Sequence, residues 1–333
     1  MDNLTHTAIG LFLARAGLKR LSPRATGILL LAANAPDCDV VSWFGGSLTY
    51  LRYHRHITHS LVALPVMALV TVALIRFAGR KPVHWPGAFA AACIGVGSHL
   101  LLDWTNIYGI RMLLPFSGSW LRLDTTNIID LWIWAICLLG IVGPFLSRLV
   151  GSEITSGAAG ARNHGRASAI VALLFILLWD SARGVMHARA VATLSSRLYE
   201  GGLPMRVMAS PDAANPFLWR GVVETQGSFF VEDVNLAWPD PSEARPAVFR
   251  KPDPEPAIEV ARQSEAIRAF LEFAQYPLWR VTPWTEMENS RLVELFDMRF
   301  GSPAAPGFMA SAVVNGNGQI VRSSFGFGTP RPR

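Results

Sequence analysis

The first half of the chain alternates long apolar segments with short polar connections. Four of these segments approach the roughly 20 residues that a helix needs to cross the ~30 Å hydrocarbon layer of a membrane. Two shorter ones precede them and are expected to cross only in part. In chain order, the six segments are residues 7–18, 25–35, 61–77, 86–102, 128–146 and 167–179. The pattern predicts an all-α, multi-pass membrane helical bundle over residues 1–183, with four clear spanning helices and two short N-terminal helices.

The pattern changes to that of a small soluble α+β domain over residues 184–327. Alternating apolar and polar positions predict strands there, and a 3.6-residue period predicts one helix. The predicted elements are a hairpin of residues 217–224 and 229–236, a helix at 257–274, and strands at 278–282, 292–300 and 319–325. No catalytic motif appears in this region, so we expect a lid, a substrate guide or a partner-binding module. The tail, residues 328–333, is expected to be disordered.

Composition places the excess positive charge in the apolar half. The chain is 51% hydrophobic and carries a formal net charge of +6. Residues 1–183 hold 15 Lys and Arg but only 8 Asp and Glu, whereas residues 184–333 hold 15 and 16. A basic balance confined to an apolar region is typical of a membrane protein. We therefore expect the lipid bilayer, and not nucleic acid, as a partner.

The distribution of Lys and Arg between the connections predicts the orientation. One set of alternate connections holds ten of these residues and the other set holds four. The richer set is expected to be cytoplasmic. Tracing the chain through each predicted helix then places the N-terminus and the domain after Arg183 on the extracytoplasmic side.

Residues of the metal-binding types gather on that same predicted face. His99 and Asp103 lie four residues apart in an apolar segment, so their side chains share one helical face. An ionisable pair in apolar surroundings costs free energy unless something specific compensates it, and a metal cation would do so. Asp37 and Asp39 follow Pro36 where the second short helix ends, although Pro-Asp is also typical of a plain turn.

Three histidines within six residues lead into the segment 61–77. Packing rarely explains such a cluster, so His54, His56 and His59 favour metal ligation through imidazole nitrogen. Arg55 lies between them. Its guanidinium either contacts a phosphate or extends to the membrane interface.

Two helix starts carry candidates that also have simpler explanations. His6 lies four residues after Asp2, a spacing that is equally consistent with an N-terminal helix cap. Asp124 is typical of a cap, whereas Asp130 lies one turn inside an apolar segment and requires a partner. We assign Asp130 and Arg55 to catalysis.

In combination, these motifs resemble the YdjM-type family of bacterial inner-membrane proteins, described as membrane-bound metal-dependent hydrolases. The resemblance covers about residues 1–180. The matching pieces are Thr5-His6, Pro36-Asp37-x-Asp39, His54-Arg55-x-Ile57-Thr58-His59-Ser60, and Ser98-His99-Leu-Leu-Leu-Asp103 with Pro115-Phe116 downstream. One departure is His56, where the family usually has glycine. The family remotely resembles the zinc-dependent phospholipase C and P1 nuclease group, which implies a multi-zinc cluster and phosphoester hydrolysis.

We therefore predict a membrane-bound hydrolase that acts on a phosphoester or lipid-linked substrate. One to three divalent ions, most simply zinc, would activate the attacking water. The predicted ligands are His6, Asp37, Asp39, His54, His59, His99 and Asp103. The alternative is a non-enzymatic membrane protein. In it, the His and Asp groups would form an ion or proton site or a structural polar core, and the C-terminal domain would bind a partner.

Overall fold

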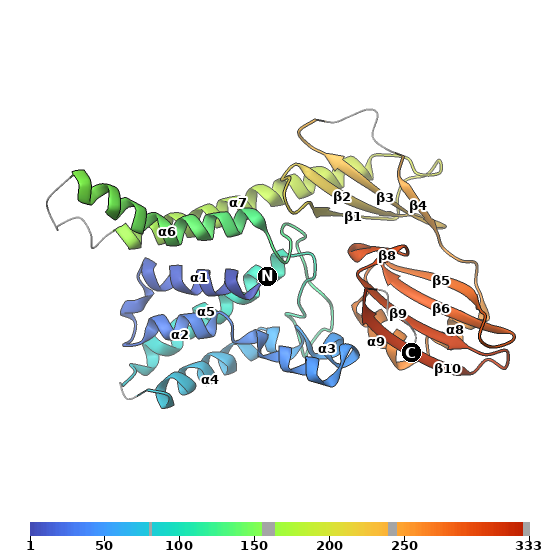
Figure 1. Ribbon diagram of the computed structural model, residues 1–333, viewed down its shortest axis with the longest axis horizontal. Coiled ribbons are helices and arrows are strands. Elements are labelled where there is room, and N and C mark those ends of the chain that lie inside the picture. The colour runs from blue at the N-terminus through green and yellow to red at the C-terminus, as the bar shows by residue number, and fades with distance from the viewer. Residues whose placement is uncertain (80–81, 155–163, 239–244, 329–333) are drawn as a thin grey trace. The chain divides into compact units, whose positions relative to one another are not determined.

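The computed structural model describes residues 1–79, 82–154, 164–238 and 245–328 (Figure 1). These residues form two compact units that are not contiguous in sequence. The first unit comprises Met1–Asp39, Arg55–His187 and Pro211–Pro216, and the second comprises Val40–His54, Ala188–Ser210 and Phe217–Arg333. The predicted domain boundary after residue 183 lies four residues before His187, where the segment Arg55–His187 of the first unit ends. Of the predicted tail, residues 329–333 lie outside the described residues.

Helices form wherever the sequence pattern predicted them in the first half. Six of them correspond to the six apolar segments, with ends that shift by a few residues or extend further. They are α1 (Asn3–Ala16), α2 (Ala25–Ala32), α4 (Ala63–Phe77), α5 (Trp85–Thr105), α6 (Leu131–Ile154) and α7 (His164–Ser195). Shorter helical turns lie between them, namely η1 (Leu18–Arg20), η2 (Pro36–Gly45), α3 (Ser47–Tyr53) and η3 (Ile57–His59).

The prediction of four spanning helices is confirmed only in part. Within the described residues, two helices are long and apolar enough to cross a membrane, Trp85–Thr105 and Gly165–Ser195. A third candidate is Ala63–Phe77, when the bent segment before it is counted with it. Within the residues whose side chains are described, α6 contributes a shorter apolar helix, Leu131–Leu146.

Small residues bring the backbones of α1, α2 and α5 into close contact. A Cβ atom at Gly10 of α1 would lie 2.8 Å from the Leu29 carbonyl oxygen of α2. A Cβ atom at Gly95 of α5 would lie 2.7 Å from Cβ of Ala32. Both distances are shorter than real Cβ contacts, so only glycine fits. One turn after Gly95, His99 is therefore held against the end of α2.

Helices α1, α6 and α7 pack around Gly140. A Cβ atom there would lie 2.7 Å from Phe12 of α1 and 2.8 Å from Ala172 of α7. Pro144, inside α6, cannot donate the usual hydrogen bond to the carbonyl of residue 140. The Ser168 hydroxyl of α7 donates to that carbonyl instead, at 2.9 Å. A neighbouring helix thus satisfies the backbone group that proline leaves without a donor.

The second unit contains two four-stranded sheets. The first has the order β1-β2-β3-β4 and the second β10-β9-β6-β5. Their strands are β1 (Arg206–Pro211), β2 (Leu218–Glu224), β3 (Ser228–Asn235), β4 (Ala247–Arg250), β5 (Pro277–Trp284), β6 (Ser290–Asp297), β9 (Phe308–Val314) and β10 (Ile320–Phe327). The short strands β7 (Gly301–Ser302) and β8 (Ala305–Pro306) pair with each other, next to η4 (Met298–Phe300). The predicted hairpin is confirmed, because β2 and β3 pair antiparallel with Val223 opposite Phe230.

The helix predicted at 257–274 is two helices. These are α8 (Pro256–Ala261) and α9 (Glu265–Phe273). Ser264 separates them because its hydroxyl accepts a hydrogen bond from the backbone N–H of Ile267 and so caps α9. Both helices pack against β9 of the second sheet (Figure 1). The prediction of a small α+β region is confirmed.

Candidate metal centre

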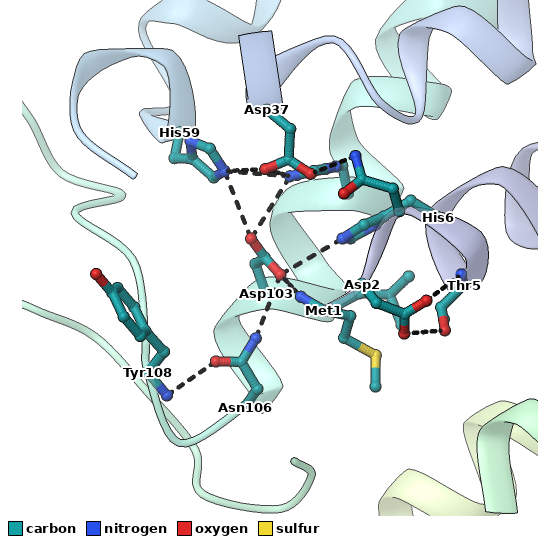
Figure 2. Close-up of polar contacts among 12 residues, drawn as sticks. Met1, Asp2, Thr5, His6, Asp37, His59, Asp103, Asn106 and Tyr108 are labelled. Atoms are coloured by element: carbon teal, nitrogen blue, oxygen red, sulfur yellow. Dashed lines mark hydrogen bonds and ion pairs between the residues drawn. The ribbon is translucent and has the colours of Figure 1, made fainter. Parts of the chain in front are cut away.

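Four side-chain atoms converge in the first unit, from three segments of the chain. Asp37 follows Pro36 at the start of η2, His59 ends η3, and His99 and Asp103 share one face of α5. Figure 2 shows Asp37, His59 and Asp103 pointing toward one another. The Nε2 atoms of His59 and His99 lie 3.1 Å apart. Asp37 Oδ1 lies 3.5 and 3.6 Å from these two nitrogens, and Asp103 Oδ2 lies 3.4 and 3.5 Å from them. These four residues form a group that could hold a metal ion, because their ligand atoms all lie within 4.8 Å of one another.

The outer nitrogen of each imidazole fixes the direction of its ring. Nδ1 of His99 lies 2.8 Å from the backbone carbonyl oxygen of Ala33. Nδ1 of His59 lies 3.2 Å from the carboxylate of Asp39. A carbonyl or carboxylate oxygen only accepts, so each Nδ1 carries the proton and each neutral ring turns its Nε2 lone pair inward. Four electron-pair donors therefore face one point, an arrangement that requires a proton or a cation between them.

The spacing of these four atoms fits a tetrahedral zinc ion. Zinc binds imidazole nitrogen and carboxylate oxygen at about 2.0–2.1 Å, which gives edges of about 3.3–3.4 Å between neighbouring ligands of a tetrahedron. The five ligand-to-ligand distances above run from 3.1 to 3.6 Å. Two carboxylates would also balance the charge of a divalent ion. The residues present thus fit the group that the sequence pattern implies.

Electrostatics support the same conclusion. Burial raises the pKa of Asp37, but the hydrogen bond with His59 and the charges of His99 and His59 outweigh burial and lower it to about 2. Asp37 is therefore an anion at neutral pH, which is the form of a carboxylate that binds a metal ion.

Two further groups lie against Asp103. The His6 ring stacks on the His99 ring with centroids 3.8 Å apart, and its Nε2 lies 3.5 Å from Asp103 Oδ1. Among the described residues, neither ring nitrogen of His6 has a hydrogen-bond partner, although the side chain is fully buried. The amino group of Met1 forms an ion pair with the same oxygen (Figure 2). His6 is thus beside the four-atom cluster, with a free ring nitrogen facing Asp103.

Arg55 does not have the position of a residue that extends to the membrane interface, which is one of the two alternatives that the sequence left open. Its side chain is buried, and Nη2 donates to Asp103 Oδ1 at 3.1 Å. Nη1 donates to the Asn106 side chain at 3.1 Å and to the Gly109 carbonyl at 3.2 Å. The guanidinium also lies over the Tyr108 ring. These contacts fix the orientation of the Asp103 carboxylate through Oδ1, while its Oδ2 faces the cluster. A guanidinium that extended to the membrane interface would be exposed, whereas this one is buried.

Asp39, His54 and Asp130 lie outside the four-atom cluster. Asp39 contacts the outer nitrogen of His59, and its Oδ2 is itself held by the backbone N–H of Arg55 and the Thr58 hydroxyl, both at 2.8 Å. His54 belongs to the second unit, where its ring stacks on Tyr50 at 4.5 Å.

Asp130 caps a helix. Its carboxylate accepts from the backbone N–H groups of Trp132 and Ile133 at 3.1 Å, and Arg183 lies 4.0 Å away. These contacts supply the partner that the apolar surroundings of Asp130 require. They are the contacts of a structural N-cap at the start of α6.

Three groups at the centre were missed by sequence reasoning. Asn3 donates to Asp37 Oδ2 at 3.0 Å, and Asn106 donates to Asp103 Oδ1 at 3.2 Å. Asn3 is the first residue of α1, and Asn106 is the residue that follows α5. Asn is common at helix ends because its side chain bonds to nearby backbone groups, so neither residue indicated a site. The Ala33 carbonyl is a backbone group and leaves no trace in the sequence.

Comparison with known proteins decides the family. The model of the YdjM inner membrane protein family matches residues 1–190. The chain belongs to the YdjM inner membrane protein family. The match contains all four converging residues, and together with the apolar helices it supports an inner-membrane location.

The C-terminal region has its own match. Residues 256–330 match the YfhP C-terminal alpha/beta plait domain. The chain is also 25% identical over 339 residues to uncharacterized protein YfhP of Bacillus subtilis (strain 168), covering 98% of this chain and 94% of that one. This YdjM-family member thus resembles YfhP along nearly its whole length. No solved structure was found to match.

Proposed function

We propose that this protein is a membrane-bound, metal-dependent hydrolase whose Asp37, His59, His99 and Asp103 hold a divalent ion, most simply zinc. The observation that carries the proposal is the convergence of four electron-pair donors in a buried place, two of them imidazoles held in the metal-binding tautomer. A bound zinc ion would supply Lewis-acid chemistry and lower the pKa of water. His6, whose ring nitrogens have no hydrogen-bond partner among the described residues, is the remaining candidate ligand beside this ion.

Each residue around the cluster has a defined task in this proposal. Asp39 and the Ala33 carbonyl hold the two imidazoles, as outer-shell partners do in metal sites. Asn3 holds the second oxygen of Asp37. Arg55 holds Asp103 and keeps a positive charge beside the place where an anionic substrate would gain charge during hydrolysis.

The position of the cluster along α5 favours a substrate in the membrane surface. His99 lies six residues before the end of α5 at Thr105, which is about 9 Å along the helix, and Asp103 lies about 3 Å from it. Since α5 has the length and composition of a span, we infer a position of the cluster near one membrane boundary. A phosphoester at that depth belongs to a lipid headgroup or a lipid-linked compound, which we propose as the substrate class.

Metal content and hydrolysis test the proposal together. Full-length protein purified in detergent without chelators should contain at least one equivalent of zinc and should cleave bis(p-nitrophenyl) phosphate. The double variant His99→Ala/Asp103→Ala should lose both. His84→Ala is the matched control, because His84 is exposed at the start of α5. A wild-type protein that binds no divalent metal under these conditions would refute the hydrolase.

A structural polar core is the second candidate, and the contacts of Asp103 favour it. Arg55 and Asn106 bond to that carboxylate in a buried network that would hold α5 in place without a metal. This alternative predicts that the double variant unfolds at lower temperature but that the wild type gains no stability from zinc. A rise in the unfolding temperature of the wild type with added zinc would exclude it.

We propose that the cluster faces the extracytoplasmic side, because the Lys- and Arg-rich connections lie at the other ends of the predicted helices. Cysteine labelling of intact cells checks the orientation. The background should carry Cys38→Ser, since Cys38 is exposed. A membrane-impermeant maleimide should reach Arg111→Cys but not Lys81→Cys. The opposite pattern would place the cluster in the cytoplasm.

A further inference from the structure

A second charged feature lies on the first unit, in a cavity lined by α1, η1, α6 and α7. The cavity has a volume of about 300 Å³, which is at the lower end for small-molecule sites. Its lining combines three cationic side chains, Arg15, Lys19 and Arg166, with apolar side chains of α6. Among the described residues that line it, none is acidic. Three positive charges at one cavity favour an anionic ligand.

One of the three cations is fixed by the fold. Arg166 Nε donates to the backbone carbonyl of Ala16, at the C-terminal end of α1, at 2.9 Å. This bond places the guanidinium beside Gly17, where the chain leaves the helix with φ 152°. Arg15 lies in the last turn of the same helix. The backbone thus brings Arg15 and Arg166, from the ends of α1 and α7, to the same cavity.

The apolar side of the cavity continues along α6. Ile141 and Phe145 line it and are both exposed, Phe145 by 62%. Exposed apolar side chains next to a cationic cluster match the two parts of a phospholipid, with its charged headgroup and its acyl chains.

The location of the cavity along α7 fits a membrane boundary. Gly165–Ser195 is long and apolar enough to cross a membrane. Gly165 and Arg166 line the cavity, and the apolar segment begins immediately after them at Ala167. The cations therefore lie where phosphate groups of lipids are found.

We propose that this cavity binds the phosphate headgroup of an anionic membrane phospholipid, with Arg15, Lys19 and Arg166 as phosphate partners and Ile141 and Phe145 against the acyl chains. The site is separate from the metal centre and does not depend on the proposed hydrolase. Each cation near a phosphate is expected to strengthen binding about fivefold, so removing two should weaken it about 25-fold.

Native mass spectrometry of the full-length protein in a nonionic detergent tests this proposal. The protein is titrated with dioleoylphosphatidylglycerol or dioleoylphosphatidylcholine, and retained lipids are counted. The test variant is Arg15→Gln/Lys19→Gln, which leaves Arg166 and its bond to α1 in place. The control is Arg20→Gln/Arg76→Gln, which removes two exposed charges outside the cavity. Arg15→Lys/Lys19→Arg keeps both charges.

The proposal expects the wild type to retain phosphatidylglycerol over phosphatidylcholine, and the test variant to lose about 25-fold in affinity for phosphatidylglycerol alone. The control and the charge-keeping variant should bind as the wild type does. Equal retention of both lipids, or an equal loss in the control, would overturn the proposal. Displacement of the lipid by 20 mM inorganic phosphate would also overturn it, because the cavity would then recognise free phosphate. An unfolding temperature of the test variant equal to that of the wild type would exclude general misfolding as the cause.

Discussion

Asp39 offers the sharpest test of how the candidate metal centre is built. The sequence placed it among the ligands, whereas the structure places it behind His59, where its Oδ2 lies 3.2 Å from Nδ1 of the ring. The substitution Asp39→Asn keeps the size of the side chain and an acceptor oxygen but removes the negative charge. The imidazole loses a charge-assisted hydrogen bond, and its Nε2 becomes a weaker donor to a metal.

The size of the effect follows from this position. Loss of an outer-shell partner weakens metal binding by about 10- to 100-fold, or about 1.4–2.8 kcal/mol. The number of bound ions should not change, because Asp37, His59, His99 and Asp103 remain. Loss of a direct ligand in Asp103→Asn should instead prevent stoichiometric binding.

Competition with a fluorescent zinc chelator, using purified full-length protein, measures these affinities. Asp130→Asn is the control, since it makes the same chemical change at the N-cap of α6 and should leave zinc affinity unchanged. If Asp39→Asn removes a whole equivalent of zinc, Asp39 is a ligand and the geometry above is wrong. If its affinity equals that of the wild type, Asp39 does not support His59.

Three further predictions concern stability. Arg55→Lys should lower the free energy of unfolding by about 3 kcal/mol, because an ammonium cannot replace all three hydrogen bonds of a buried guanidinium. A thermal melt within error of the wild type would contradict this. Adding EDTA should lower the unfolding temperature, and excess zinc should restore it, since a ligand at 1,000 times its Kd stabilises by about 4 kcal/mol; an EDTA-insensitive melt would count against a bound metal. Gly140→Ala should destabilise the protein by about 1–3 kcal/mol, because the added Cβ would meet Phe12 and Ala172. Gly118→Ala is the control, since there is open space around Gly118 and its stability should not change. Equal melting temperatures for the two variants would show that α1, α6 and α7 do not pack as described.

Ionisable residues in apolar segments cost free energy, and this signal identified the pair His99 and Asp103. Two other signals identified the rest of the cluster, because His59 belongs to a group of three histidines and Asp37 follows a proline that ends a helix. The distinction between ligand and supporting residue was not accessible, since Asp37 and Asp39 have the same chemistry and only the direction of the chain after Pro36 separates them. Asp130 was conspicuous for the same reason, yet its partners are backbone N–H groups, which the sequence does not display.

Some elements of secondary structure could likewise be predicted from the sequence and others could not. Apolar length predicted the helices of the first unit, and alternation predicted the β2–β3 hairpin. Strand β9 was missed because it lies between β10 and β6, and its residues from Met309 to Val314 are all buried, so the alternation that reveals an edge strand is absent. The break between α8 and α9 was missed because apolar residues keep a helical period on both sides of Ser264.

The close packing of α1, α2 and α5 at Gly10 and Gly95 has a consequence for biogenesis. On translocon-insertion scales an Asp at the centre of a spanning helix costs about 2.5–3.5 kcal/mol, and less near the end. As a membrane span, α5 would therefore insert with a penalty from His99 and Asp103. The Ala33 carbonyl and Asp37 reach these residues only after α2 has docked. Under the proposed function, metal uptake would therefore be a late event, after helix insertion and assembly. A chelator present only during synthesis should leave a protein that still loads zinc afterwards.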